Sequence, residues 1–323
     1  AATIQAVLET IALFAYLNYR FKGFWHSFDK NLFFQQLKYA LPFGLMGILW
    51  TIQADVHNYF IGYRFSAEEM AIYRAGCFEL PLLFLLQESV SSVMIPRMSQ
   101  LQADGNYREM IELTARATEK LSLAYFPTYI FFLITAHTFI TTLFTKNFAE
   151  SVPIFIINIT LLPFAVFIAD PITRAFSSLG KYVLKVRIFI VILLLVTLNY
   201  GIRHFDLKGM IAIVVITALI DRLASTFKIW KTVGVKVSDI YLLKNVGKVA
   251  LVAMTAGIPT YFVYQLIRDF TPALGRQISL LIFNAPKETV VETIGGLFIL
   301  GFTGLFFGAI YVSGLFLFGI VPE

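Results

Sequence analysis

Nine stretches of mostly apolar residues recur along the chain, and they constrain its fold more than any other feature. A helix that crosses the hydrocarbon core of a membrane needs ~20 such residues. The stretches lie at about 2–19, 40–62, 71–95, 121–144, 153–173, 182–201, 209–229, 247–267 and 290–320. The sequence therefore predicts an all-α, polytopic membrane helix bundle with about nine transmembrane helices.

Composition narrows the function classes. Charged residues make up 14% of the chain, against ~25% in soluble domains, so lipid is the expected surrounding. The single cysteine, Cys77, excludes a disulfide framework and a thiolate metal cluster. The sequence lacks the motifs of P-loop ATPases, zinc proteases and α/β-hydrolases. We therefore expect no enzyme, no metal and no cofactor.

Basic residues indicate the orientation. Most of the 26 Lys and Arg residues stand in four segments between apolar stretches, at 20–38, 96–120, 174–187 and 222–248. The excess of positive charge in cytoplasmic loops places these segments in the cytoplasm. Such short clusters are a topology signal and predict no nucleic-acid partner. Residue 1 is then expected outside and Glu323 inside. Because the chain opens directly into a span, we expect a fragment that lacks earlier spans.

Two of these cytoplasmic segments predict structure of their own. Residues 20–38 mix Lys with Phe and Trp, which suits a helix lying in the membrane interface. Residues 104–119 begin with a turn at 104–106 and continue as a second surface helix, in which Glu112 and Arg116 are spaced for an ion pair. The alternative for 104–119 is a docking site for a partner, such as a polysaccharide-assembly protein.

Ionisable residues inside the spans are the candidate functional residues. Each costs roughly 2.5–3.5 kcal/mol at the centre of a membrane helix, so it is expected to face protein or water. Asp170 and Arg174 are expected to set topology at a helix end, and Glu9 has no assigned role. The full set is Glu9, Asp55, Arg74, Glu79, Glu88, Asp170, Asp221 and Arg222.

The second span carries the clearest pattern. Small and polar residues advance by three or four positions, which puts them on one helix face. They are Gly44, Gly47, Thr51, Asp55 and Asn58. Such a stripe is typical of a tight helix contact or of a water-filled cavity. The carboxylate of Asp55 favours the cavity.

The third and seventh spans hold the remaining candidates. In the third, Pro81 can kink the helix, and Arg74 and Glu88 fall near each other on an ideal helix. Arg74 either snorkels or binds substrate, and Glu79 is deep enough to need a partner or a cavity. In the seventh, Asp221 belongs to an i,i+4 polar row and either lines a path or pairs with a cation of a neighbouring helix.

Four stretches resemble the second lobe of the polysaccharide (O-antigen) flippases of the multidrug/oligosaccharidyl-lipid/polysaccharide exporter superfamily. The likeness runs from about residue 39 to 245, and the pattern Tyr73, Gly76, Glu79, Pro81 is among its most specific parts. The stretches are LKYALPFGL at 37–45, FSAEEMAIYRAGCFELPLL at 65–83, IPRMSQLQADGNYREM at 95–110 and FPTYIFFLITAHTFITTLFTKNFAES at 126–151.

The resemblance implies a two-lobe exporter in the bacterial cytoplasmic (inner) membrane. Residues 1–38 would hold the last helix of the first lobe and a linker, 39–235 the six-helix second lobe, and 236–323 two additional helices. The implied activity is translocation of a polyprenyl-pyrophosphate-linked oligosaccharide, with Arg74 meeting the anionic head. Asp55, Glu79, Glu88, Asp221 and Asn58 would line the path, bonding sugar hydroxyls or holding a coupling H⁺ or Na⁺.

Three other functions stay open. A cation-coupled multidrug exporter and a lipid II exporter belong to the same superfamily, and an acidic cavity suits organic cations. A membrane glycan polymerase is the alternative from another class. Such enzymes need a large outer loop, and the longest one here is 268–289.

Overall fold

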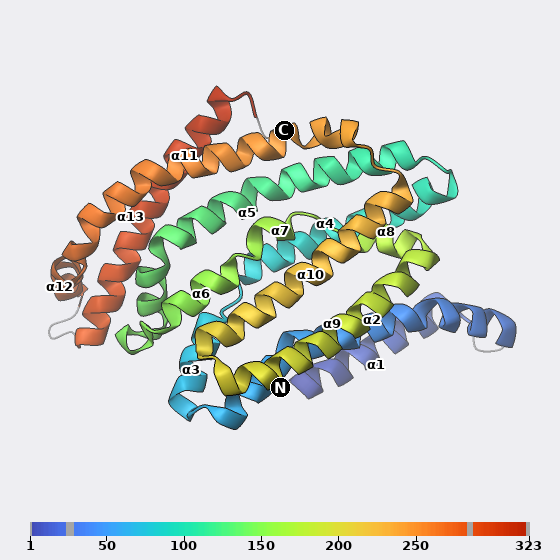
Figure 1. Ribbon diagram of the computed structural model, residues 1–323, viewed down its shortest axis with the longest axis horizontal. Coiled ribbons are helices and arrows are strands. Elements are labelled where there is room, and N and C mark those ends of the chain that lie inside the picture. Colours follow the sequence, from blue (N-terminus) through green and yellow to red (C-terminus); the bar gives the residue numbers. More distant parts are fainter. Residues whose placement is uncertain (1, 24–28, 283–286, 321–323) are drawn as a thin grey trace. The chain divides into compact units, whose positions relative to one another are not determined.

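The computed structural model describes residues 2–23, 29–282 and 287–320, and nearly all of them are helical (Figure 1). Five segments among them are long and apolar enough to cross a membrane. The polytopic helical membrane fold is thus confirmed. The five are α5 (Tyr107–Phe144), α9 (Ser177–His204), α10 (Leu207–Val233), the run Val237–Phe270, and α13 (Glu288–Leu317); the run contains η3 (Val237–Leu243), α11 (Lys244–Ile267) and η4 (Arg268–Phe270).

The other four predicted spans differ in kind. Helices α3 (Ala67–Gly76) and α4 (Pro81–Ala103) form a sixth span together, bent by 50°. Helices α1 (Ala2–Arg20) and α2 (Lys30–Arg64) are long enough but fall short of the same mean hydropathy. The stretch 153–173 is broken into α6 (Ser151–Ile159), α7 (Leu162–Ala165) and α8 (Asp170–Ala175).

Proline explains that break. Pro163 stands in the first turn of α7 and Pro171 in the first turn of α8. A proline is tolerated there because the first N–H groups of a helix have no partner in the helix, whereas further inside it would break the hydrogen-bond ladder. The apolar stretch at 153–173 is therefore divided among three helices.

The described residues group into two compact units, 1–45 and 46–323. The first holds α1 and the beginning of α2. Asp29 caps α2, because its Oδ1 accepts hydrogen bonds from the backbone N–H of Asn31 (2.8 Å) and Leu32 (3.1 Å). Residues 30–38 are consequently the first turns of a long helix, and 24–28 of the predicted interfacial helix lie outside the described residues. The domain boundaries after 38 and 235 stay predictions.

In the second unit, α9 and α10 pack along each other as a hairpin, while α5, α11 and α13 pack together as a second group (Figure 1). Asp206 caps α10 by accepting the Gly209 N–H at 2.9 Å. Leu194 and Leu198 from α9 and Met210 from α10 are fully buried in the same core. Helix α3 packs on α6, and α12 (Thr271–Ile282) packs on α13.

The bend between α3 and α4 has a clear local cause. Tyr73 is fully buried, and its hydroxyl bonds Nδ1 of His57 on α2 at 3.0 Å. A Cβ at Gly76 would lie 2.6 Å from the Ile154 side chain, so only glycine lets α3 approach α6 this closely. Pro81 starts α4. The break leaves Arg74 and Glu88 on separate helices, so their predicted proximity on one ideal helix does not apply.

The turn before α5 is confirmed, but the expected ion pair is not. Gly105 has φ +69°, and the Asn106 side chain caps α5 by accepting the Glu109 N–H at 3.2 Å. From there α5 runs as one helix to Phe144, so 104–119 is its first part. Glu112 pairs with Arg108 at 2.9 Å and not with Arg116. The reason is that two further acceptors, on η3, also hold the Arg108 guanidinium.

Candidate functional site

The polar stripe of α2 lies on an exposed face. Helix α2 buries Met46, Gln53, His57 and Ile61. Thr51 and Asp55 of the stripe are exposed, and Asn58 is half-buried. No atom of the described residues comes within 4 Å of a Cβ built at Gly47. Within the described part of the chain, the stripe is therefore not a tight helix contact, which leaves the cavity interpretation open.

The break between α3 and α4 presents further charges. Arg74 stands in the last turn of α3, and Glu79 lies in the non-helical residues before α4. Both side chains are exposed, and so is that of Glu88 on α4. The Tyr73 hydroxyl bonds Nδ1 of His57 at 3.0 Å. Because Arg74 follows Tyr73 and Asp55 lies two residues before His57, α2 and α3 bring these two candidates to one region. Glu79 and Glu88 follow on the same bent span.

Asp221 has a different environment. It is 8% exposed, and Thr217 and Ser225 of its polar row are buried as well. Arg187 of α9 pairs with it across the hairpin, with Nη2 and Oδ2 separated by 3.3 Å. A second nitrogen of Arg187, Nη1, donates to the backbone oxygen of Met46 at 3.3 Å. Pairing with a cation of a neighbouring helix, one of the two interpretations left open, is what the structure shows.

This buried cluster is not fully satisfied. Five buried polar atoms from α2, α9 and α10 have no hydrogen-bond partner among the described residues. They are Gln53 Oε1, Arg187 Nε, Asp221 Oδ1, Arg222 Nη1 and Ser225 Oγ. Most buried polar groups in proteins do find a partner, in protein or in ordered water. These five atoms on three helices therefore keep the capacity to bond water or a polar ligand.

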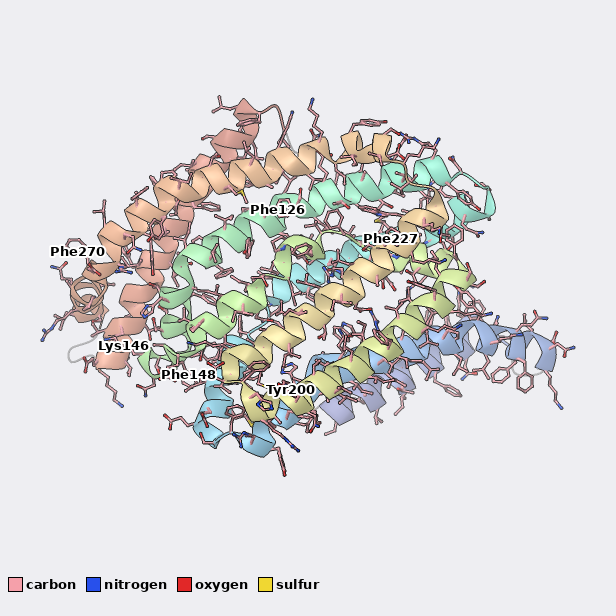
Figure 2. The ribbon with its side chains drawn as sticks, in the orientation of Figure 1. Phe126, Lys146, Phe148, Tyr200, Phe227 and Phe270 are labelled. Atoms are coloured by element: carbon pink, nitrogen blue, oxygen red, sulfur yellow. The ribbon has the colours of Figure 1, made fainter. Side chains whose placement is uncertain are left out.

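Arg222 extends the cluster toward α5. It follows Asp221 on α10, and α10 contacts α5. The Tyr125 hydroxyl donates to the backbone oxygen of Leu83 at 2.7 Å. Figure 2 draws the side chains along these helices and labels Phe227 on α10 and Tyr200 on α9, both of which are exposed.

Sequence reasoning missed Arg187 as a site residue. The charge bias counted it with the cytoplasmic segment 174–187, although it falls inside the stretch 182–201. Its place within an apolar run was the available signal. Of the other charged residues, Glu9 accepts a hydrogen bond from Gln5 at 2.8 Å, and Asp170 pairs with Arg174 at 2.7 Å at the start of α8.

The long apolar helices of the described residues are those of a multi-pass, helical membrane protein. Residues 2–153 match the model of a family described as polysaccharide biosynthesis protein. This part of the chain is thus similar to that family. It contains α1 to α5 and every predicted site residue except Asp221. The searches of curated proteins and of solved structures gave no match.

Proposed function

We propose that this protein acts in polysaccharide biosynthesis as a flippase. It moves a polyprenyl-pyrophosphate-linked oligosaccharide across the bacterial cytoplasmic membrane, from the cytoplasmic to the outer leaflet, by alternating access. It is a transporter rather than an enzyme. One observation carries the proposal. Asp55 on α2, Arg74 on α3 and Glu79 at the break are all exposed, and they lie inside the segment 2–153 that matches the polysaccharide biosynthesis family.

The chemistry of the cargo fits these residues. Sugars and a pyrophosphate cannot cross hydrocarbon, whereas the polyprenyl tail can remain in it. A guanidinium at a helix break offers two parallel N–H donors to the anionic head, and Arg74 supplies it. Carboxylates and an amide beside it bond sugar hydroxyls or hold a coupling H⁺ or Na⁺, which gives roles to Asp55, Asn58, Glu79 and Glu88.

Irregular backbone supports the same interpretation. Non-helical residues at membrane depth are tolerated where they are covered by protein or line a water-filled space, and broken helices form the substrate sites of many transporters. The break at 77–80 carries Glu79 and follows directly on Arg74. Asp221 joins the path when its pair with Arg187 opens, since both groups already have unpaired polar atoms.

Surface polysaccharide export tests the site. In a strain that lacks its own flippase and is complemented with the gene for this protein, Arg74→Ala and Glu79→Ala should each lower surface polysaccharide at unchanged membrane abundance. Arg64→Ala and Glu68→Ala are matched controls, because both remove an exposed charge from α2 or α3 away from the break. Normal export by both site variants, or an equal loss in the controls, contradicts the assignment.

Cysteine labelling tests whether water reaches the path. In a Cys77→Ser background, Asp55→Cys and Glu79→Cys should react with a membrane-impermeant thiol reagent. Ile48→Cys is the control, since Ile48 is 59% exposed on the same helix α2 but stands outside the polar stripe. If positions 55 and 79 stay as unreactive as position 48, these residues face lipid and the proposed path is absent.

A cation exporter of the same superfamily is the second candidate function. The observation that favours it is charge: three exposed carboxylates, on Asp55, Glu79 and Glu88, accompany Arg74. Such a set attracts organic cations. Proton- or sodium-driven uptake of an organic cation into inverted vesicles, with no effect on lipid-linked sugar, would decide for this function.

A further inference from the structure

Two adjoining cavities lie near one end of α5, α8 and α10. The distribution of Lys and Arg predicts that this end faces the cytoplasm. The first has a volume of about 210 Å³, and its lining is almost wholly apolar, including Ile168, Ile229 and Trp230. The second, of about 320 Å³, has a polar lining of Glu112, Arg116, Glu119, Lys244 and Asn245 in addition to its apolar part. Ala115 and Leu242 line both cavities, so the apolar space opens beside the polar one.

The acidic groups of the polar cavity are already engaged. The Glu112 carboxylate pairs with Arg108 at 2.9 Å, and the Asn245 amide donates to Glu119 at 2.8 Å. The two cations of this cavity are exposed and form no ion pair with any residue that the structure describes. These cations are Arg116 and Lys244. Arg108 neutralises Glu112, and the two cations outnumber the one remaining carboxylate, that of Glu119, so the cavity favours an anion.

The segment η3 closes the apolar cavity on one side. Arg108 Nη1 bonds Asp239 Oδ1 at 2.5 Å, and Nη2 bonds the Tyr241 hydroxyl at 2.8 Å, so α5 holds η3 in place. Val237 and Ile240 line the cavity and yet remain 83% and 63% exposed. Exposed apolar side chains in a segment that also carries lysines are typical of a segment that lies at the membrane surface.

We propose that the two cavities together bind one anionic phospholipid of the cytoplasmic leaflet. A hydrocarbon chain occupies the apolar cavity, where burial of apolar surface stabilises it, and the phosphate lies between Arg116 and Lys244. The segment 222–248, which surrounds the site, is the most basic of the cytoplasmic segments, and such segments attract anionic lipids. This site is separate from the transport path and does not depend on the proposed function.

Trp230 provides a direct readout. The chain has three tryptophans, so Trp25→Phe/Trp50→Phe leaves one reporter in the wall of the apolar cavity. The variant is reconstituted into phosphatidylcholine vesicles that contain a small fraction of brominated lipid, which quenches tryptophan on contact. Brominated phosphatidylglycerol should quench Trp230 several-fold more than an equal fraction of brominated phosphatidylcholine. Equal quenching by the two lipids would overturn the proposal.

Charge variants locate the headgroup. In the single-tryptophan background, Arg116→Gln/Lys244→Gln should abolish the preference for the anionic lipid. Lys120→Gln/Lys231→Gln is the matched control. It removes two exposed positive charges from α5 and α10, and neither residue lines either of the two cavities. Equal losses in both pairs would show attraction to a generally basic surface and would refute a defined site.

Two more variants test the rest of the site. Ala115→Phe projects into both cavities and should abolish the preference with all charges retained. Arg108→Ala should weaken it, because it frees Glu112 to pair with Arg116 one turn on and releases η3 from α5. Circular dichroism and size-exclusion profiles verify folding in each case. An unchanged preference in a folded Ala115→Phe protein would contradict occupation of these cavities.

Discussion

Removing Arg187 should lower the stability of the membrane domain far more than removing an exposed charge would. The Arg187 and Asp221 side chains are 21% and 11% exposed, and they meet at 3.3 Å between α9 and α10. Deleting one member of a buried ion pair leaves the other charge uncompensated, at a cost of about 3–5 kcal/mol. Because both side chains keep some exposure and their closest atoms are 3.3 Å apart, we expect Arg187→Leu to cost ~3 kcal/mol, at the lower end of that range.

The double variant separates pairing from mere burial. Replacing both partners by apolar residues leaves no buried charge behind, and such replacements are often neutral or stabilising. Arg187→Leu/Asp221→Leu should therefore be more stable than either single variant. Lys185→Leu, which removes an exposed charge two residues away on α9, should change stability little.

Unfolding in mixed micelles measures these differences. Helicity is followed by circular dichroism as the fraction of a denaturing detergent rises. The unfolding midpoints of the unsubstituted protein, the two single variants and the double variant are compared, with Lys185→Leu as the control. If the double variant is less stable than both single variants, by the sum of their losses, the two side chains act independently and the reasoning from the ion pair is refuted. A stable double variant that fails to complement polysaccharide export would assign the pair to transport.

Two further predictions concern packing and a surface ion pair. Gly76→Val should lower the free energy of unfolding by roughly 1–3 kcal/mol through overpacking against Ile154. Gly47→Val should be nearly neutral, because no described atom outside its own helix backbone lies within 4 Å of a Cβ at that position. Thermal unfolding in detergent compares the two variants, and equal effects would refute the α3–α6 contact. Lys146, which Figure 2 labels at the connection between α5 and α6, pairs with Glu292, and this bond raises the pKa of Lys146 above its ordinary value of 10.5. The stabilisation from the pair is then complete below that pH and is lost as pH rises through the raised value. Lys146→Met should cost less than ~1 kcal/mol near neutral pH because the pair is exposed, and a deficit that does not shrink in strongly alkaline buffer would contradict the pairing.

Much of the local structure followed from residue types and their spacing. Apolar stretches of helix length predicted the membrane class, and the turn at 104–106 was readable because Gly105 and Asn106 tolerate and cap such a geometry. Pro81 predicted a bend that the structure places between α3 and α4. Mean hydropathy marked 153–173 as one apolar stretch, and Pro163 and Pro171 divide it because each begins a new helix.

The candidate site shows where sequence reasoning ended. The helical period correctly grouped Thr217, Asp221 and Ser225 on one buried face, since neighbours at i and i+4 share a face whatever surrounds them. The same argument grouped the α2 stripe around Asp55 but could not tell that the opposite face packs. Periodicity relates residues within one helix and carries no information about the helix beside it.

Sequence by itself determined that this chain is a helical membrane protein, roughly where each helix runs, and which side chains are costly to bury in lipid. The ion pairs were decided by the tertiary structure alone. Asp221 pairs with Arg187 of another helix, and Arg108 pairs with Asp239, which is more than a hundred residues away in the sequence. The physical reason is range. Hydropathy and backbone preferences act within a few residues along the chain, whereas ion pairs depend on distances of a few ångströms that only the packing of whole helices sets.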